Sequence, residues 1–226
     1  MPKLAAALAL AGCLAGSSAF GGTNVKGTLW LSAGAREASR HAEGTAARQQ
    51  KSAGEGVVWV EKIPAELERA LADPPRGWFV FWKPKADPPL PRVGERDDRF
   101  SPRVLAVPAG TSVEFANRDR LYHSAFSVSG AKRFDLGKAP PGRRDTLEFG
   151  RAGVVNLHCE IHPKAVGYVV VTPNRAYATP DASGRFRLPR LPAGRYVLHA
   201  WHPRLGELSL PFNVPRRGTV ELNPTF

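Results

Sequence analysis

Leu157-His158-Cys159-Glu160-Ile161-His162-Pro163 places a cysteine and a histidine three residues apart at the end of an apolar run. A second histidine, His123, lies well upstream, on a separate segment with strand-like alternation. One thiolate and two imidazoles form the equatorial ligand set of a mononuclear copper site that transfers electrons. This spacing therefore predicts that His123, Cys159 and His162 hold one copper ion.

The part of the chain around these residues has the pattern of an all-β fold. Short apolar or alternating segments are separated by turns rich in Gly, Pro, Asn and Asp. The predicted strands are residues 104–107, 112–115, 122–128, 145–149, 154–157 and 167–171. Short strands at this spacing predict a Greek-key sandwich or barrel.

A second, smaller unit is predicted after Pro173, where turn sequences at 179–184 and 191–194 each precede a strand. About 50 residues is small for an independent sandwich. The unit is therefore expected either to borrow N-terminal strands near Leu29 and Val57 or to pack on the larger unit.

These patterns give predicted boundaries along the chain. They are a signal peptide at 1–19, N-terminal strands and long loops at 20–99, a copper-binding sandwich at 100–172 and a β-sandwich-like unit at 173–226. Within 20–99 we expect one or two helical turns at 64–71, an apolar strand at 78–82 and an exposed connection at 83–98.

The N-terminus predicts export. Lys3 precedes the apolar residues 4–11, and Ser17-Ser18-Ala19 offers a cleavage site. The alternative is Leu10-Ala11-Gly12-Cys13, which resembles a bacterial lipobox and would leave a lipid anchor at Cys13. Either route predicts a periplasmic location, the second as a membrane-anchored lipoprotein.

After cleavage at Ala19, Cys159 is the one remaining cysteine, so no internal disulfide is expected. A buried, inert thiol is the alternative to a metal ligand. The formal net charge of +12 favours acidic partners or anionic membrane surfaces, or is simply a solvated basic surface. No nucleic-acid motif, transmembrane segment, nucleophile–base pair, catalytic carboxylate pair or phosphate loop is found, so we expect a non-enzymatic protein.

Several segments resemble the cupredoxin family of the plastocyanin type. They are residues 100–105, 108–115, Asn117-Arg118-Asp119 followed by His123, residues 134–137 and Cys159-Glu160-Ile161-His162-Pro163. More narrowly, the chain resembles cupredoxin-like methylamine utilization proteins, and residues 181–186 and 191–196 resemble their carboxypeptidase-regulatory-like sandwich. The resemblance implies His123, Cys159 and His162 as copper ligands and a redox partner protein.

The sequence departs from that family at Ala165, where the pattern expects a weak axial Met. An alanine methyl cannot coordinate, so water, a backbone carbonyl or no ligand is expected there, and a raised reduction potential follows. Ser124 is expected to tie the two ligand loops together. Three functions stay open: an exported electron carrier, a copper-handling protein without electron shuttling, and a binding module with a degenerate site. Zinc also suits these ligands if a fourth is present.

Overall fold

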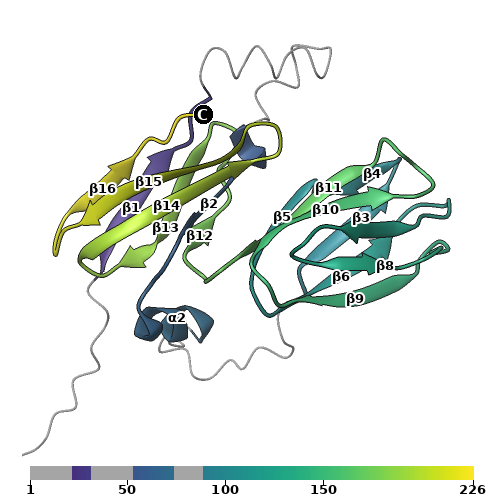
Figure 1. Cartoon of the computed structure of the whole chain (residues 1–226), viewed down its shortest axis with the longest axis horizontal. Helices are drawn as coiled ribbons and strands as arrows, with labels where there is room; N and C mark the ends of the chain where they lie inside the picture. Colours follow the sequence, from purple (N-terminus) through teal and green to yellow (C-terminus); the bar gives the residue numbers. More distant parts are fainter. Residues whose placement is uncertain (1–21, 32–52, 74–88) are drawn as a thin grey trace, which may run out of the picture.

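The computed structural model describes residues 22–31, 53–73 and 89–226, which form two β-sandwiches lying side by side (Figure 1). The predicted all-β fold is confirmed. The predicted signal peptide, the alternative anchor at Cys13 and the apolar segment 78–82 lie outside the described residues.

The first sandwich, β3 to β11, consists of a five-stranded and a four-stranded sheet. In spatial order, the five-stranded sheet contains β5 (Val104–Pro108), β11 (Val166–Thr172), β10 (Gly153–Cys159), β7 (Ala125–Val128) and β8 (Arg133–Asp135). The four-stranded sheet contains β4 (Arg99–Ser101), β3 (Arg92–Arg96), β6 (Thr111–Asn117) and β9 (Arg144–Phe149). Only β5–β11 and β3–β6 pair in parallel within this sandwich.

The second sandwich combines strands from both ends of the chain. One sheet contains β13 (Arg185–Leu191), β1 (Thr23–Thr28) and β16 (Thr219–Leu222). The other contains β12 (Tyr177–Ala178), β2 (Val57–Val60), β14 (Gly194–His202) and β15 (Gly206–Val214). The C-terminal unit therefore borrows two N-terminal strands, and the first sandwich is inserted between β2 and β12.

A helix, α2 (Ala65–Ala72), follows β2 and covers one end of the second sandwich (Figure 1). Its Leu67 is buried in the core of that sandwich, with Leu71 packed against the same core. These are the two side chains that the sequence placed on one helical face, because residues four apart are neighbours on a helix.

Residues 92–96 differ from the expectation for the N-terminal region. They form strand β3 rather than part of an exposed connection, so the first sandwich begins before residue 100. Backbone pairing accounts for the difference: Val93 and Glu95 lie opposite Phe115 and Asn117 in a parallel ladder with β6. This pairing carries Glu95 into the interior, where its side chain is buried.

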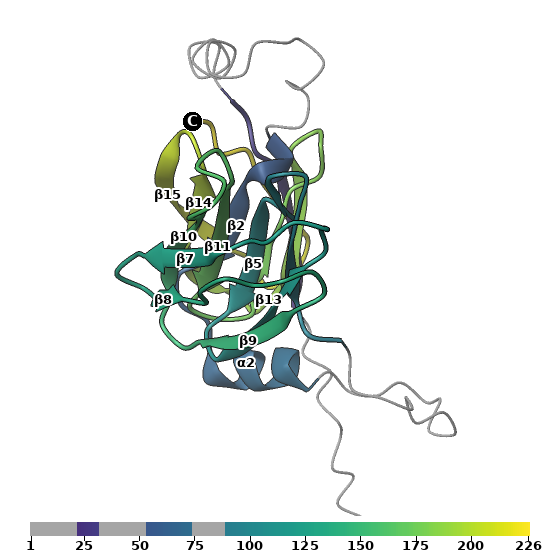
Figure 2. The same cartoon turned by 90° about the vertical axis from the view of Figure 1, so that its right-hand side faces the viewer.

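The two sandwiches contact each other through β11, whose side chains alternate between two apolar environments. Val169 and Val171 point into the core of the first sandwich, while Val170 packs with Val57 and Trp201 between the sandwiches. Because both faces of β11 are covered, its sequence is a continuous apolar run. The view in Figure 2 looks onto the inserted sandwich with the second one behind it.

In the part of the chain that the structure describes, no helix has the length and apolar character needed to cross a membrane.

Candidate metal centre

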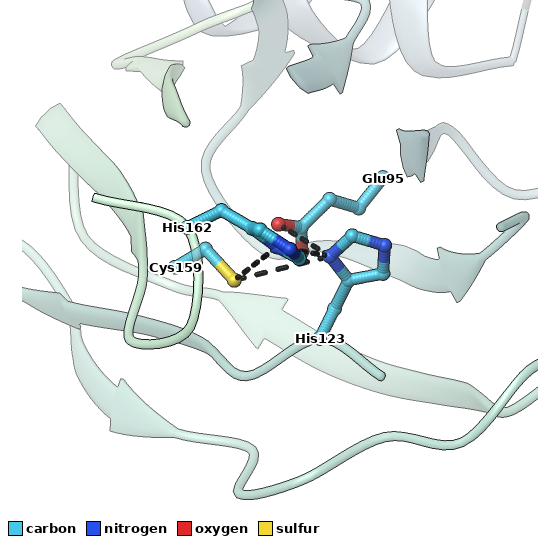
Figure 3. A group of neighbouring side chains, drawn as sticks. All are labelled: Glu95, His123, Cys159 and His162. Atoms are coloured by element: carbon cyan, nitrogen blue, oxygen red, sulfur yellow. Dashed lines mark hydrogen bonds and ion pairs between the residues drawn. The ribbon is translucent and has the colours of Figure 1, made fainter. Parts of the chain in front are cut away.

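Three segments of the first sandwich bring the sequence-predicted residues together (Figure 3). Cys159 is the last residue of β10, and His162 lies in the turn that follows. His123 comes from the segment between β6 and β7, where its backbone exchanges two hydrogen bonds with Ala139. Cys159 pairs with Ala125 of β7. This pairing holds the cysteine beside the His123 segment.

The donor atoms of these three residues face one another. His123 Nδ1 lies 3.0 Å from His162 Nδ1, and Cys159 Sγ lies 3.9 Å and 3.7 Å from these two nitrogens. Nitrogen and sulfur atoms bound at about 2.0–2.3 Å to one ion lie roughly 3–4 Å apart. The three donor atoms therefore have the mutual spacing of ligands around one metal ion.

The structure adds a fourth donor that the sequence did not predict. Glu95 Oε1 lies 3.0 Å from His123 Nδ1, and the ligand atoms of Glu95, His123, Cys159 and His162 all lie within 4.8 Å of one another. Glu95 is 4% exposed, and its Oε1 has no hydrogen-bond partner among the described residues. A buried carboxylate oxygen without a donor is costly unless a cation balances it, so Glu95 fits a metal ion here.

Both imidazole rings have a carboxylate on their outer nitrogen. His123 Nε2 lies 3.3 Å from Asp119 Oδ2, and His162 Nε2 lies 3.1 Å from Asp98 Oδ1. A carboxylate in this place selects the tautomer with the proton on Nε2 and leaves Nδ1 with a lone pair. With both rings in this tautomer, two lone pairs would lie 3.0 Å apart and repel each other, and a cation between them would remove the repulsion.

Hydrogen bonds hold the Asp119 carboxylate beside Nε2 of His123. The carboxylate accepts the Arg120 N–H at 2.6 Å and the Asp97 N–H at 3.0 Å. These two bonds and the His123 contact hold the pKa of Asp119 below its usual range, with the Arg120 bond contributing most. Asp119 is therefore an anion that can keep accepting from His123.

The thiol is buried and tied to the neighbouring loop. The Ser124 N–H donates to Cys159 Sγ at 3.4 Å, and the Glu160 N–H donates to the Ser124 carbonyl at 2.9 Å. The Ser124 hydroxyl lies 3.2 Å from Glu160 Oε2. Ser124 thus links the two ligand loops. Burial raises the pKa of the Cys159 thiol, and the contact with Glu95 raises it further.

Two other residues have roles outside the donor group. Ala165, at the position where a Met was expected, is 1% exposed and packs in the core of the first sandwich with Cys159. His158 points away from the donors and lies against Phe126, with ring centroids 5.6 Å apart. Alternation along β10 explains this, because neighbouring residues of a strand face opposite sides.

The donor set fits copper and, with Glu95, also zinc. A soft thiolate and two imidazoles suit copper in either oxidation state, whereas the carboxylate is a harder ligand. All three residue types are also zinc ligands, and the four residues together complete the tetrahedral shell that zinc prefers.

No family model matches this chain, and no curated protein matches it. Solved structures match it in part. The copper-containing nitrite reductase from Thermus scotoductus is 31% identical, with a TM-score of 0.36, over 38% of this chain and 23% of its own. A purple cupredoxin from Nitrosopumilus maritimus is 26% identical, with a TM-score of 0.34, over 36% of this chain and 99% of its own. An amicyanin variant in its Cu(I) form is 27% identical, with a TM-score of 0.35, over 38% of this chain and 86% of its own.

This chain therefore spans about a quarter of the nitrite reductase that it matches. Each of these matches covers less than two fifths of this chain. What the site can bind follows from its donor atoms.

Proposed function

We propose that this protein is an exported copper-binding protein that transfers single electrons. The observation that carries the proposal is the convergence of four donor atoms, from Glu95, His123, Cys159 and His162, within 4.8 Å of one another. One copper ion would be held by these side chains. When bound, it supplies a one-electron couple between Cu(I) and Cu(II).

The closed donor set supports electron transfer rather than catalysis. Catalytic metal sites keep one position open for water or substrate, whereas four protein ligands fill a tetrahedral shell. Three of the four donor residues are buried, and His162 is partly exposed. We therefore propose a non-enzymatic carrier whose exchange with a partner takes place near His162.

Glu95 changes the expected reduction potential. The sequence alone predicted a raised potential, because Ala165 offers no axial ligand. That expectation assumed that the ion has no further ligand. A carboxylate donor stabilises Cu(II) more than Cu(I). With Glu95 in the donor set, we expect a potential below that of the same site without the carboxylate.

The remaining parts of the proposal come from the sequence. Residues 1–19 support export to the periplasm, with lipidation at Cys13 as the alternative. The formal net charge of +12 supports an acidic redox partner, which it would attract over a distance. The exposed apolar residues Leu121, Tyr122 and Ile161, next to the ligands in sequence, support a protein partner at this end of the sandwich.

A second function is favoured by the carboxylate itself. Glu95 makes the donor set equally suited to zinc. The site would then bind a metal ion whose oxidation state does not change. The two functions differ in which metal the purified protein prefers and in whether the bound metal changes oxidation state reversibly.

Copper titration of the metal-free full chain tests the proposal. We expect one equivalent of Cu(II) to bind with an intense visible band from thiolate-to-copper charge transfer, and voltammetry to show a reversible one-electron couple. Cys159→Ser should abolish the band, because the sulfur is its source. Glu160→Gln is the matched control, since Glu160 is next to the ligand but outside the donor group, and it should keep the band.

Three results would contradict the proposal. They are the absence of copper binding, a Cys159→Ser variant with the same spectrum as the parent, and displacement of copper by equimolar zinc. The last result would support the second function.

A further inference from the structure

The β3–β4 hairpin has an unusual turn at the edge of the metal centre. Arg96 pairs with Arg99, so Asp97 and Asp98 form a two-residue loop, and both have positive φ angles of 51° and 57°. Such turns favour Asn, Asp or Gly at the first position and Gly at the second, so Asp97 is an ordinary residue there and Asp98 is not. An aspartate at position 98, where Gly is the favoured residue, suggests that a side chain is needed there.

This hairpin contacts both imidazole ligands. Glu95 Oε1 lies 3.0 Å from His123 Nδ1, and Asp98 Oδ1 lies 3.1 Å from His162 Nε2. The Asp97 backbone N–H donates to Asp119, the carboxylate beside Nε2 of His123. A single two-residue turn therefore connects to both histidine rings.

His162 needs such support more than His123 does. The His123 side chain is 2% exposed, and its backbone is fixed by the bridge to Ala139. The His162 side chain is 17% exposed and belongs to a turn rather than a strand. Packing alone therefore leaves its ring more freedom to rotate or to change tautomer.

We propose that Asp98 is the positioning residue for His162. Its carboxylate accepts a hydrogen bond from Nε2–H, holds the ring in one orientation and keeps the Nδ1 lone pair directed at the other ligand atoms. The Asp97-Asp98 turn places this carboxylate beside His162, and Asp98 itself does not bind the metal. The effect on copper affinity rests on the proposed function, whereas the effect on the His162 ring does not.

Glycine substitutions separate the carboxylate from the turn. Asp98→Gly and Asp97→Gly both place a favoured residue at positive φ, but only the first removes the group facing His162. The Asp97 carboxylate faces Arg96 at the surface instead. We expect Asp98→Gly to weaken copper binding about 10- to 100-fold, the range for residues that orient metal ligands. Asp97→Gly should stay within about twofold of the parent, and Asp98→Asn, which keeps an acceptor oxygen, should restore part of the affinity.

The metal-free protein supplies a readout that does not depend on copper. Nitrogen-15 NMR distinguishes the two neutral tautomers of each histidine ring and also its protonated form. We expect His162 to carry its proton on Nε2 in the parent and in Asp97→Gly. In Asp98→Gly it should become a mixture of tautomers.

The outcomes separate this proposal from the proposed function. If the parent binds copper but Asp98→Gly matches it in affinity and keeps the Nε2 tautomer, Asp98 does not position His162 and the copper function stands. If the parent does not bind copper, the copper function fails, and the tautomer measurement alone decides the role of Asp98.

Discussion

Glu95 is a carboxylate in an apolar interior, with Val93 on its own strand and Phe115 on the next also buried. An ionised carboxylate in such surroundings needs a positive partner. The nearest groups are the rings of His123 and His162 and a thiol whose pKa is raised by the same burial. A metal cation among them would balance the charge of the carboxylate and bind the sulfur as a thiolate, with the thiol proton released to water. It would thus compensate both buried groups.

Replacing this carboxylate tests its role in selecting the oxidation state. We expect Glu95→Gln to weaken Cu(II) binding about 10- to 100-fold, by analogy with the loss of groups that support metal ligands, and to affect Cu(I) binding less. For a one-electron couple, each tenfold change in the ratio of affinities corresponds to about 59 mV. The reduction potential should therefore rise in voltammetry, by at most about 60 mV for a 10-fold loss of Cu(II) affinity and about 120 mV for a 100-fold loss. An unchanged or lower potential would show that Glu95 is not a ligand. Glu160→Gln is the matched control.

At the scale of the elements, the turn between β12 and β13 is organised by one carboxylate. Asp181 Oδ1 accepts the Ser183 hydroxyl at 2.6 Å and the backbone N–H groups of Ser183 and Arg185 at 2.9 Å and 3.0 Å. The Ser183 hydroxyl contributes most, and together these bonds lower the pKa of Asp181 to about 2. The ionised side chain therefore belongs to the folded turn.

Asp181→Asn should reveal this dependence on pH. A carboxyl with a lowered folded-state pKa stabilises the fold above its unfolded pKa of about 3.9, and this stabilisation is lost as the pH falls towards 2. The difference in urea midpoint between the parent and the variant should therefore be largest near neutral pH and shrink between about pH 4 and pH 2. A difference that stays constant over this range would contradict the assignment. Carbon-13 NMR of the Asp181 carboxyl gives the pKa directly.

The elements that the sequence predicted are those with a local pattern. The strands β6, β10 and β11 alternate or form apolar runs, and the i, i+4 pair of Leu67 and Leu71 indicated α2. Likewise, the three-residue spacing of Cys159 and His162 is a local signal. It predicted a metal site and three of its residues, whose donor atoms lie close together in the structure.

The parts that the sequence did not predict depend on pairing between distant segments. Strand β3 has the sequence Arg-Val-Gly-Glu-Arg, with one large apolar residue, and its strand conformation comes from the ladder with β6. The roles of Glu95 and Asp98 follow from that ladder and from the turn at its end. Val93, between prolines and charged residues, is the one local sign that this segment enters the core.

At the scale of the molecule, the contact between the sandwiches centres on Trp201. This side chain is 7% exposed and meets Tyr168 of β11 nearly edge-on, with ring centroids 5.2 Å apart. Asn174, in the connection after β11, donates its side-chain amide to the Val60 carbonyl at 2.8 Å. Apolar packing and a buried hydrogen bond thus join the inserted sandwich to its host.

Removing the indole should loosen this contact. Trp201→Ala is expected to cost about 3–5 kcal/mol, the usual range for a buried aromatic truncated to alanine. The unfolding of the two sandwiches should then separate into two calorimetric transitions. Trp30→Ala is the control, because Trp30 is 47% exposed, and surface substitutions cost about 0.5 kcal/mol or less. Equal losses for both variants would contradict the assignment of Trp201 to the joint.

The insertion of the first sandwich between β2 and β12 also fixes the order in which the chain can complete its two halves during synthesis. All strands of the first sandwich lie between residues 92 and 172, so they are made before β12 to β16. β1 pairs with β13 and β16, so it has both neighbours only after β16 has been made, with Asn24 opposite Thr219. The half that holds the donor residues can therefore fold while its host is still an open set of strands. A chain that stops before β16 keeps its donor residues but leaves one side of β1 as an unpaired edge, the kind of surface on which proteins aggregate.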